Sequence, residues 1–308
     1  MILVTGGNGF IGSHVIDNLI SKGFNVAVFD RHKTEERKDV EYFYGDIRDW
    51  ESISEAISKS DGVIHLAGVL GTQETVKNPL PAVQTNIIGS LNVFEACSLH
   101  NKKGVYIAVG NHWMNNPYSI TKTTAERFAL MFNKERGTKI AVVRGFNAYG
   151  PRQQAEPVRK IIPNFIIPAL KNEDILIYGS GEQRMDMIYV EDLAEILVRA
   201  LITEHNCYDK IFEAGTGIAP TVNEIAKNII SLCGSKSEIK HAEMRPGEEK
   251  ESIVRADVRT LCPLSFASGI SLSKLVCLLM EEGVYEFVFT SLDYGLSKTI
   301  EWYKKNVK

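Results

Sequence analysis

Residues 2–12 read ILVTGGNGFIG, and this stretch decides the fold of the 308-residue chain. Its first four residues are apolar or β-branched, which is typical of a buried parallel strand. Three glycines follow at positions 6, 9 and 12, and Ser13–Ile20 then has the apolar spacing of a helix. A second apolar run, Val26–Phe29, ends at Asp30. These are the parts of a βαβ unit that binds a dinucleotide, because the glycines permit a tight turn where backbone N–H groups meet a pyrophosphate.

The residues after the second predicted strand bear on which cofactor is bound. An acid at the position of Asp30 can accept hydrogen bonds from both ribose hydroxyls of adenosine, which favours NAD. Arg31 follows directly, and a basic residue there could instead hold the 2′-phosphate of NADP. We predict NAD as the cofactor, with Asp30 and Arg31 beside its adenosine.

The alternation of strands and helices continues after the first unit. Val40–Tyr44 and Gly62–Gly68 are predicted strands, with a helix near Trp50–Lys59 between them. Repeated units of this kind predict an α/β fold with a Rossmann-type, doubly wound parallel sheet. Ligands of such sheets bind at the carboxyl ends of the strands, where Asp46 lies.

Composition and charge exclude several classes of protein. The formal net charge is −3, without the basic excess of a nucleic-acid-binding protein. Apolar runs stay below the roughly 18 residues that a membrane span needs. The five cysteines are scattered, which argues against a disulfide framework or a metal site. We expect a cytoplasmic protein that binds neither nucleic acid nor a membrane.

A tyrosine and a lysine are placed for proton transfer. Tyr118 and Lys122 lie four residues apart after Pro117, so they share one face of a predicted helix. A nearby ammonium favours phenolate and lowers the pKa of a tyrosine, which can then exchange the proton that accompanies hydride transfer. Tyr294 and Lys298 have the same spacing, but in a predicted C-terminal surface helix away from any cofactor strand.

Further motifs extend the pattern along the chain. They are GDI at 45–47, HLAG at 65–68, TNIIG at 85–89, RGFNAYGP at 144–151, IYG at 177–179, IYVED at 188–192 and RPGE at 245–248. With the glycine turn and the Tyr118/Lys122 pair, the sequence resembles the NAD-dependent epimerase/dehydratase family of extended short-chain dehydrogenase/reductases. Its pattern is closest to that of the UDP-glucose/UDP-galactose 4-epimerases.

The resemblance implies roles residue by residue. Tyr118 is the expected acid/base and Lys122 its partner, which also binds the nicotinamide ribose. The other implied cofactor-binding residues are Gly6, Gly9, Phe10, Ile11, Gly12, Asp30, Asp46, Ile47, Leu66, Ala67, Gly68, Asn86 and Phe146. The implied binding residues for a nucleotide-diphosphate sugar are Asn147, Lys160, Ile161, Tyr178, Arg245 and Glu248, with Arg245 on the diphosphate.

The resemblance also implies an organisation. Residues 1–150 form the NAD-binding domain, with parts of 175–215 completing its sheet, and 151–308 form mainly a smaller, interleaved α/β substrate-binding region. The helices expected around Ala82–Leu99 and Ile120–Asn133 carry apolar residues on more than one face. In this family such helices usually form a homodimer through a four-helix bundle.

Three departures from the family pattern stand out. The turn before the tyrosine, at residues 106–113, lacks the usual serine or threonine that bonds the sugar oxygen. Asn111 is the first candidate for a replacement donor on position, followed by His112 and Thr72. Met185 stands where an arginine on the diphosphate is usual, and residues 262–291 form a longer, more apolar insert than the family has.

We therefore expect a nucleotide-sugar 4-epimerase that oxidises its substrate at C4 transiently through NAD. A dehydratase or decarboxylase of the same family is disfavoured, because the residues between Val105 and Tyr118 include no acid. An NAD(P)-dependent nucleotide-sugar reductase and a non-catalytic NAD-binding regulator remain as alternatives.

Overall fold

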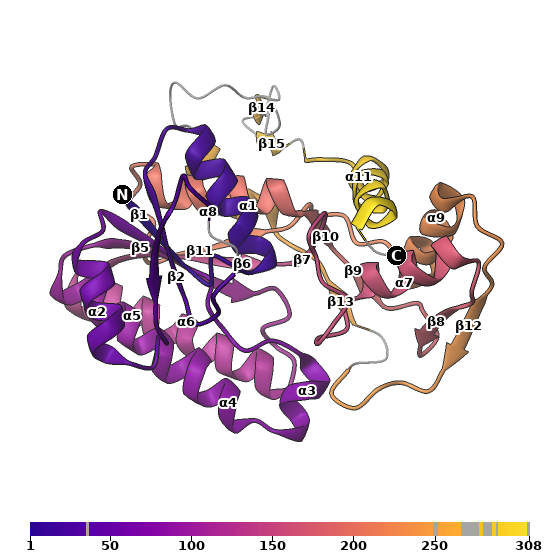
Figure 1. Ribbon diagram of the computed structural model, residues 1–308, viewed down its shortest axis with the longest axis horizontal. Coiled ribbons are helices and arrows are strands. Elements are labelled where there is room, and N and C mark those ends of the chain that lie inside the picture. The colour runs from indigo at the N-terminus through magenta and orange to yellow at the C-terminus, as the bar shows by residue number, and fades with distance from the viewer. Residues whose placement is uncertain (35–36, 249–251, 266–276, 280–284, 288, 307–308) are drawn as a thin grey trace.

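The chain forms a larger part around a parallel sheet and a smaller part beside it (Figure 1). The computed structural model describes residues 1–34, 37–248, 252–265, 277–279, 285–287 and 289–306. Among the helices in these ranges, none is long and apolar enough to span a membrane.

The central sheet has seven parallel strands in the order β3-β2-β1-β4-β5-β6-β11. Their bounds are β1 Ile2–Thr5, β2 Val26–Asp30, β3 Glu41–Tyr44, β4 Gly62–His65, β5 Lys103–Val109, β6 Lys139–Gly145 and β11 Ile211–Ala214. Val4 pairs with Val28 on one side and with Ile64 on the other. The winding direction reverses between β1 and β4, which confirms the predicted doubly wound sheet and places its switch point there.

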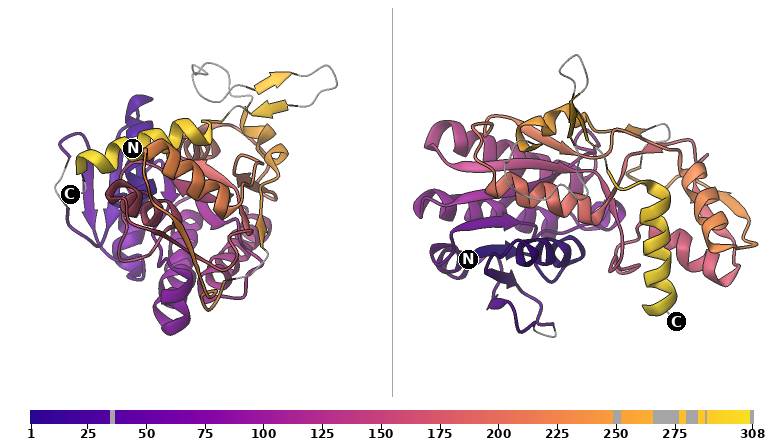
Figure 2. Two further views of the ribbon diagram at one scale, coloured as in Figure 1. Left: turned by 90° about the vertical axis from the view of Figure 1, so that its right-hand side faces the viewer. Right: turned by 90° about the horizontal axis from the view of Figure 1, so that it is seen from above.

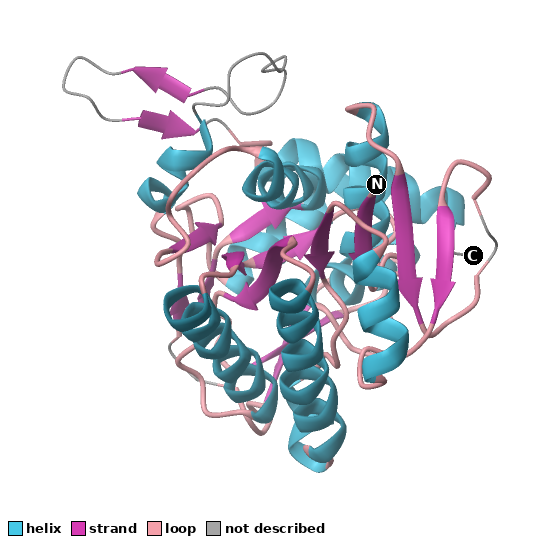
Figure 3. Cartoon of the chain, turned by 90° about the vertical axis from the view of Figure 1, so that its left-hand side faces the viewer, coloured by secondary structure: helices cyan, strands magenta, loops and turns pink. Residues whose placement is uncertain are grey.

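Helices cover both faces of this sheet (Figure 3). One face packs against α1 Phe10–Ser21 and α8 Val190–Ile202, and the other against α2 Trp50–Ser58, α5 Ser90–Leu99 and α6 Pro117–Arg136. Successive strand residues alternate between the two cores, since Leu3 belongs to one and Val4 to the other. Strands buried on both faces read as the continuous apolar runs seen in the sequence.

The helix expected over residues 82–99 is three elements. They are α4 Leu80–Ala82, a π-helix η1 Val83–Gly89, and α5. Gly89 lies against Ile47, where an added Cβ would come within 2.6 Å of the isoleucine side chain. A π-helical stretch is often found at a functional site, and Asn86 in this one forms hydrogen bonds with Val69 in the loop after β4.

The smaller part packs three helices around its own core. They are α7 Ile161–Lys171, α9 Val222–Cys233 and the C-terminal α11 Leu292–Asn306, which lies against this part in Figure 2. Short parallel pairs complete it and link it to the sheet: β8 Ile175–Tyr178 with β12 Ile239–Ala242, β7 Asn147–Tyr149 with β10 Met187–Tyr189, and β9 Arg184–Met185 with β13 Ile253–Val254.

The remaining short elements lie at the edges of the two parts. They are α3 Thr72–Lys77, a 3₁₀ helix η2 Val258–Leu261, α10 Cys262–Ser265, and an antiparallel pair of β14 Cys277–Leu279 with β15 Tyr285–Phe287. α10, β14 and β15 belong to the insert predicted over 262–291, and most of that insert lies outside the described residues.

Candidate active site

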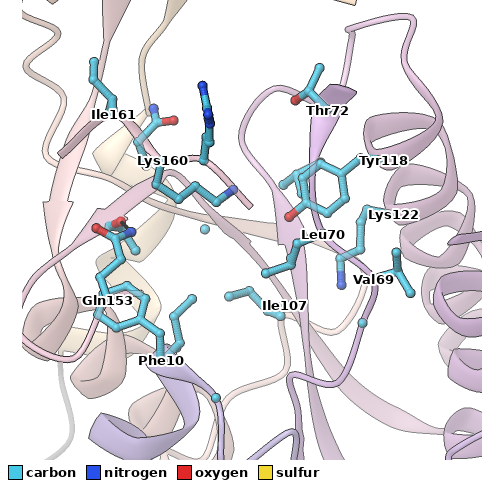
Figure 4. Close-up of a pocket in the computed structure, with 18 of the residues that line it drawn as sticks. Phe10, Val69, Leu70, Thr72, Ile107, Tyr118, Lys122, Gln153, Lys160 and Ile161 are labelled. Carbon is cyan, nitrogen blue, oxygen red and sulfur yellow. Dashed lines mark hydrogen bonds between the residues drawn. The ribbon is translucent and has the colours of Figure 1, made fainter. Parts of the chain in front are cut away.

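A cleft of about 1000 Å³ runs between the two parts, at the carboxyl ends of the sheet strands. From the larger part it is lined by the β1–α1 turn, the residues after β2, β4 and β5, and the start of α6. From the smaller part it is lined by the start of α7, β8 and the turn at 245–248. Figure 4 shows Phe10, Gln153 and Lys160 on one side of it, across from Tyr118 and Lys122.

The glycine turn at one end of the cleft fits a dinucleotide pyrophosphate. Gly6 has a φ of 70°, and a Cβ on it would lie 2.8 Å from the Ala67 nitrogen. A Cβ on Gly12 would lie 2.4 Å from the Gly6 oxygen. The N-cap of α1 is Gly9, so no side chain of the cap itself blocks the helix N-terminus, where backbone N–H groups and the helix dipole favour an anion.

Two acids line the adenosine end of the cleft. Both oxygens of Asp30 are anchored, one by the Asn8 N–H at 3.2 Å and one by the His32 N–H at 3.0 Å. Asp46 accepts two bonds from the Arg48 guanidinium, which holds the pKa of that carboxyl below its usual range. Asp30 therefore offers the remaining lone pairs of a fixed carboxylate to a ribose diol, whereas Asp46 is largely occupied by its arginine.

The backbone of Leu66–Gly68, which follows β4 and lines the cleft as a wall, is held in place by buried polar groups. The Thr5 hydroxyl oxygen accepts from the N–H groups of Leu66 and Ala67, both at 3.2 Å. His65 lies 2.7 Å from the same hydroxyl through Nδ1, and 3.0 Å from the Ser90 hydroxyl through Nε2. Burial lowers the pKa of His65 to about 3, so the ring is neutral and fixes the wall without carrying charge.

Asn86 lies behind the cleft instead of lining it. Its side chain accepts from the Val69 N–H at 2.7 Å and donates to the Val69 carbonyl at 3.0 Å. It also donates to the Thr121 hydroxyl at 3.0 Å, so it ties the loop after β4 to α6. The structure therefore places Asn86, predicted to line the nicotinamide half, as a support for residues that do.

Tyr118 and Lys122 both line the cleft from the first turns of α6 (Figure 4). Asn116 caps this helix, its side chain accepting from the Ser119 N–H at 3.0 Å. The Lys122 ammonium lies 4.2 Å from the centre of the Tyr106 ring, and the Tyr106 hydroxyl donates to the Lys122 carbonyl at 3.0 Å. The main chain and the side chain of Lys122 are thus both positioned by one buried tyrosine.

The proton affinities of this pair differ from the sequence-based expectation. Burial raises the pKa of Tyr118 to about 12. Burial also lowers the pKa of Lys122 to about 7, against the opposing charge of Glu126. The pKa of Tyr118 is therefore raised in the protein alone, in contrast to the lowering expected beside a lysine, because burial is the largest cause for both groups.

In the turn at residues 106–113, which lacks serine and threonine, the Phe146 ring packs against Gly110. A Cβ on Gly110 would lie 2.8 Å from the Phe146 ring, so the ring occupies the space beside this residue. The Asn111 amide donates to the Met114 sulfur at 3.3 Å and lines the cleft, as does Thr72. His112 is not among the lining residues. Of the three proposed replacement donors, the structure brings Asn111 and Thr72 to the cleft that Tyr118 lines, and not His112.

Basic and aromatic side chains gather at the other end of the cleft. The Arg245 guanidinium stacks on the Tyr178 ring at 4.6 Å and forms an ion pair with Glu248. Lys160 and Ile161 line the cleft at the start of α7, and burial lowers the pKa of the Lys160 ammonium. These groups suit a nucleoside diphosphate, which offers a flat base and two anionic phosphates.

The neighbouring residues Arg184 and Met185 point to opposite sides of their strand. Met185 lines the cleft, whereas the Arg184 side chain is exposed and donates to the Ala219 carbonyl at 3.1 Å. An arginine one position away therefore does not replace the one that is missing.

Gln153 and Thr85 are among the lining residues that sequence analysis did not predict. Gln153 is 6% exposed, and its amide nitrogen donates to the Ala148 carbonyl at 2.9 Å. Its amide oxygen is buried without a hydrogen-bond partner among the described residues. Thr85 lines the cleft from η1. The sequence signal for Gln153 is its position two residues after the RGFNAYGP motif, which ends at Pro151.

Comparisons with known proteins agree with this geometry. Residues 2–113 and 110–215 match the family model described as the NAD dependent epimerase/dehydratase family. A putative UDP-glucose 4-epimerase of Methanocaldococcus jannaschii is 32% identical, over 80% of this chain and 87% of that protein. A UDP-N-acetyl-alpha-D-glucosaminuronate decarboxylase of Bacillus cytotoxicus is 28% identical, over 98% of this chain and 97% of that protein.

A solved structure shows the same fold. The UDP-glucose 4-epimerase of Thermotoga maritima, determined with UDP-glucose, superposes with a TM-score of 0.86 at 29% identity. The match covers 100% of this chain and 99% of that one. The UDP-glucose 4-epimerase of Thermus thermophilus, determined with NAD, gives a TM-score of 0.82 at 25% identity, over 99% of both chains.

We expect Lys122→Met to be more stable than the parent at pH 7, with a difference that shrinks as the pH rises. Because the folded-state pKa of Lys122 is lowered from 10.5 to about 7, the unfolded chain binds a proton above pH 7 that the folded protein has released. Stability of the parent then rises with pH, by at most about 1.4 kcal/mol per pH unit. Urea titrations at pH 7, 8 and 9 measure the difference.

The control for this prediction is Lys298→Met, at the exposed lysine that shares the tyrosine spacing. It should show no trend of this kind with pH. A pH-independent difference between the parent and Lys122→Met would contradict the lowered pKa.

Proposed function

Because the chain belongs to the NAD-dependent epimerase/dehydratase family, we propose that it is a nucleotide-sugar 4-epimerase acting on a UDP-hexose. The observation that carries the proposal is the position of Tyr118 and Lys122. They line the same cleft as the glycine turn at one end and the basic and aromatic group of Lys160, Tyr178 and Arg245 at the other. A sugar tethered by its diphosphate to the second group would lie in the cleft that the tyrosine lines.

The residues present fit NAD, through the glycine cradle and the anchored Asp30 carboxylate. When bound, NAD would accept a hydride from the sugar and return it, and its oxidised ring would add a positive charge to the site. Tyr118 would accept the proton of the C4 hydroxyl and give it back, and the Lys122 ammonium would favour the phenolate while it does so.

Asn111 supplies the hydrogen bond that a serine or threonine makes in the family pattern. Its amide nitrogen is bonded to the Met114 sulfur, which is a weak acceptor, so a sugar oxygen can replace that sulfur as partner. An N–H aimed at the C4 oxygen would stabilise the ketone formed there. Thr72 lines the same cleft and is the second candidate.

The distribution of acids favours an epimerase over the decarboxylases among the relatives. Within the described part of the chain, the acids that line the cleft are Asp30, Asp46, Asp174 and Glu248. The first two lie at the adenosine end and the last two belong to the smaller part. The turn between β5 and Tyr118, where such decarboxylases tend to place a glutamate, contains no acid.

The experiment that tests the proposal is proton NMR of the protein with UDP- and dTDP-hexoses in D₂O, without added reductant. Conversion of UDP-glucose to UDP-galactose with no deuterium in the sugar is the expected result, because the hydride returns within the site. Deuterium at C3 or C5, or a keto product, would assign a dehydratase or a different epimerase. Unchanged sugars throughout would favour the reductase or the regulator.

Tyr118→Phe should retain NAD and lose turnover by about 10²-fold or more, because the acid/base is removed while the ring stays in place. The chain contains a matched control in Tyr294→Phe. Tyr294 also has a lysine four residues on, 5.5 Å from its ring centre, but lies exposed on α11. The epimerisation rate of each variant is measured, and its NAD content is determined spectroscopically. An equal loss of rate in both variants would contradict the assignment of Tyr118.

We further propose that the protein is a homodimer through α5 and α6, which pack side by side on the outside of the sheet (Figure 3). Ile120 is 50% exposed and Met131 37% exposed on α6, which suits burial in a four-helix bundle. Light scattering should give twice the chain mass of 34.4 kDa. Met131→Glu should give the monomer, whereas Ile218→Glu, at an apolar residue exposed elsewhere, should leave the mass unchanged.

A further inference from the structure

A buried carboxylate lies directly behind the substrate side of the cleft. Asp186, between β9 and β10, is 0% exposed. One of its oxygens accepts from the Thr216 N–H at 2.7 Å and from the Thr216 hydroxyl at 2.8 Å. The other accepts from the Gly217 N–H at 2.8 Å and from the Ala256 N–H at 3.1 Å. Burial raises the pKa of this carboxyl, and the hydrogen bonds from Thr216, Gly217 and Ala256 oppose that rise.

The backbone of the same residue makes three further hydrogen bonds. Its N–H donates to the Val254 carbonyl at 2.8 Å. Its carbonyl accepts from the Asn147 N–H at 3.2 Å and from the Asn147 side-chain amide at 3.0 Å. Asp186 therefore joins three segments that are far apart in the sequence: the start of β7, the turn after β11, and the end of β13.

These joined segments form one wall of the cleft. Phe146, Asn147 and Val254 line it, as do Met185 and Met187 on either side of Asp186. The amide nitrogen of Asn147 is bonded to the Asp186 carbonyl through one N–H, so its amide oxygen and its second N–H are left for a ligand. Displacement of Asp186 would therefore change the orientation of the Asn147 amide and also the positions of the residues that form this wall.

We propose that Asp186 is a positioning residue for the nucleotide-sugar, which fixes the Asn147 amide and the wall formed by Met185, Met187 and Val254. This inference rests on the proposed function, since it assumes that the cleft beside Asn147 holds the substrate. Asp186 itself is not a lining residue and acts only through the groups that it holds.

The packing around the carboxylate explains why an acid is required. A Cβ on Gly215 would lie 2.7 Å from the Asp186 carboxylate, so the main chain approaches closely at that point. An asparagine has the same size, but its NH₂ group would face N–H donors and leave them without an acceptor in a site that water does not reach. The substitution Asp186→Asn therefore alters the charge and hydrogen bonding of the side chain and leaves its volume nearly the same.

A second buried aspartate six residues later supplies a matched control. Asp192 is 1% exposed and accepts from the Thr290 N–H at 2.8 Å and the Thr290 hydroxyl at 3.0 Å. Neither Asp192 nor Thr290 lines the cleft. A purely structural role for a buried carboxylate would make the Asp186→Asn and Asp192→Asn variants behave alike.

The experiment measures binding as well as turnover. We expect Asp186→Asn to weaken UDP-glucose binding by about 10-fold or more in calorimetry, because the unpaired donors around residue 186 displace the Asn147 amide and the wall from their positions. NAD affinity, followed separately by fluorescence, should change less than about 2-fold, since the glycine turn makes none of these bonds. Asp192→Asn should lower the melting temperature without altering either affinity.

Thr216→Val serves as the milder variant, because it removes one donor and keeps the carboxylate. It should weaken UDP-glucose binding in the same direction if Asp186→Asn fails to fold. Equal UDP-glucose affinity in the parent, Thr216→Val and any folded Asp186→Asn would overturn the inference. If the parent binds UDP-glucose but does not epimerise it, the proposed function is overturned. The UDP-glucose affinities of the variants then still decide this inference.

Discussion

The whole site depends on one backbone contact, between the turn after β1 and the wall after β4. A side chain on Gly6 would collide with the main chain of Ala67, so these two segments meet backbone to backbone. β1 and β4 are neighbours at the point where the sheet reverses its winding, and the cleft opens there because the helices leave on opposite faces. The apolar residues of β1, buried on both sides, hold the turn in this position.

The second constraint is the cost of keeping a cation in that cleft. Lys122 is 4% exposed, and burial lowers its pKa to about 7 against the opposing charge of Glu126. The Tyr106 ring and Glu126 offset part of this cost, but an apolar side chain of similar size would serve a merely structural role better. The presence of a buried lysine at position 122, beside Tyr118, is therefore an argument that the site performs chemistry. It weighs against the non-catalytic regulator.

Local patterns predicted the sheet and the cofactor end of the site, because each of their features lies in a short stretch of sequence. The glycine turn, Asp30 and the Tyr118/Lys122 spacing are of this kind, and the structure places all of them along one cleft. The π-helix η1 was missed because apolar spacing does not distinguish it from an α-helix. The raised Tyr118 pKa was missed because burial depends on the whole fold, and the buried Gln153 because its surroundings include the distant Tyr303, whose hydroxyl donates to the Gln153 carbonyl.

The missing hydroxyl is the clearest difference of this chain from the family pattern, and its geometry restricts the chemistry. With the Phe146 ring against Gly110, a side chain on residue 110 and this position of the ring exclude one another. A donor must then come from another residue, and Asn111 is the next along the chain. A carboxamide N–H can stabilise a developing charge, but, unlike a hydroxyl, it cannot pass a proton on. If Asn111 is the donor, proton transfer at C4 falls on Tyr118 alone, and the buried Lys122 is the cation that makes its phenolate accessible.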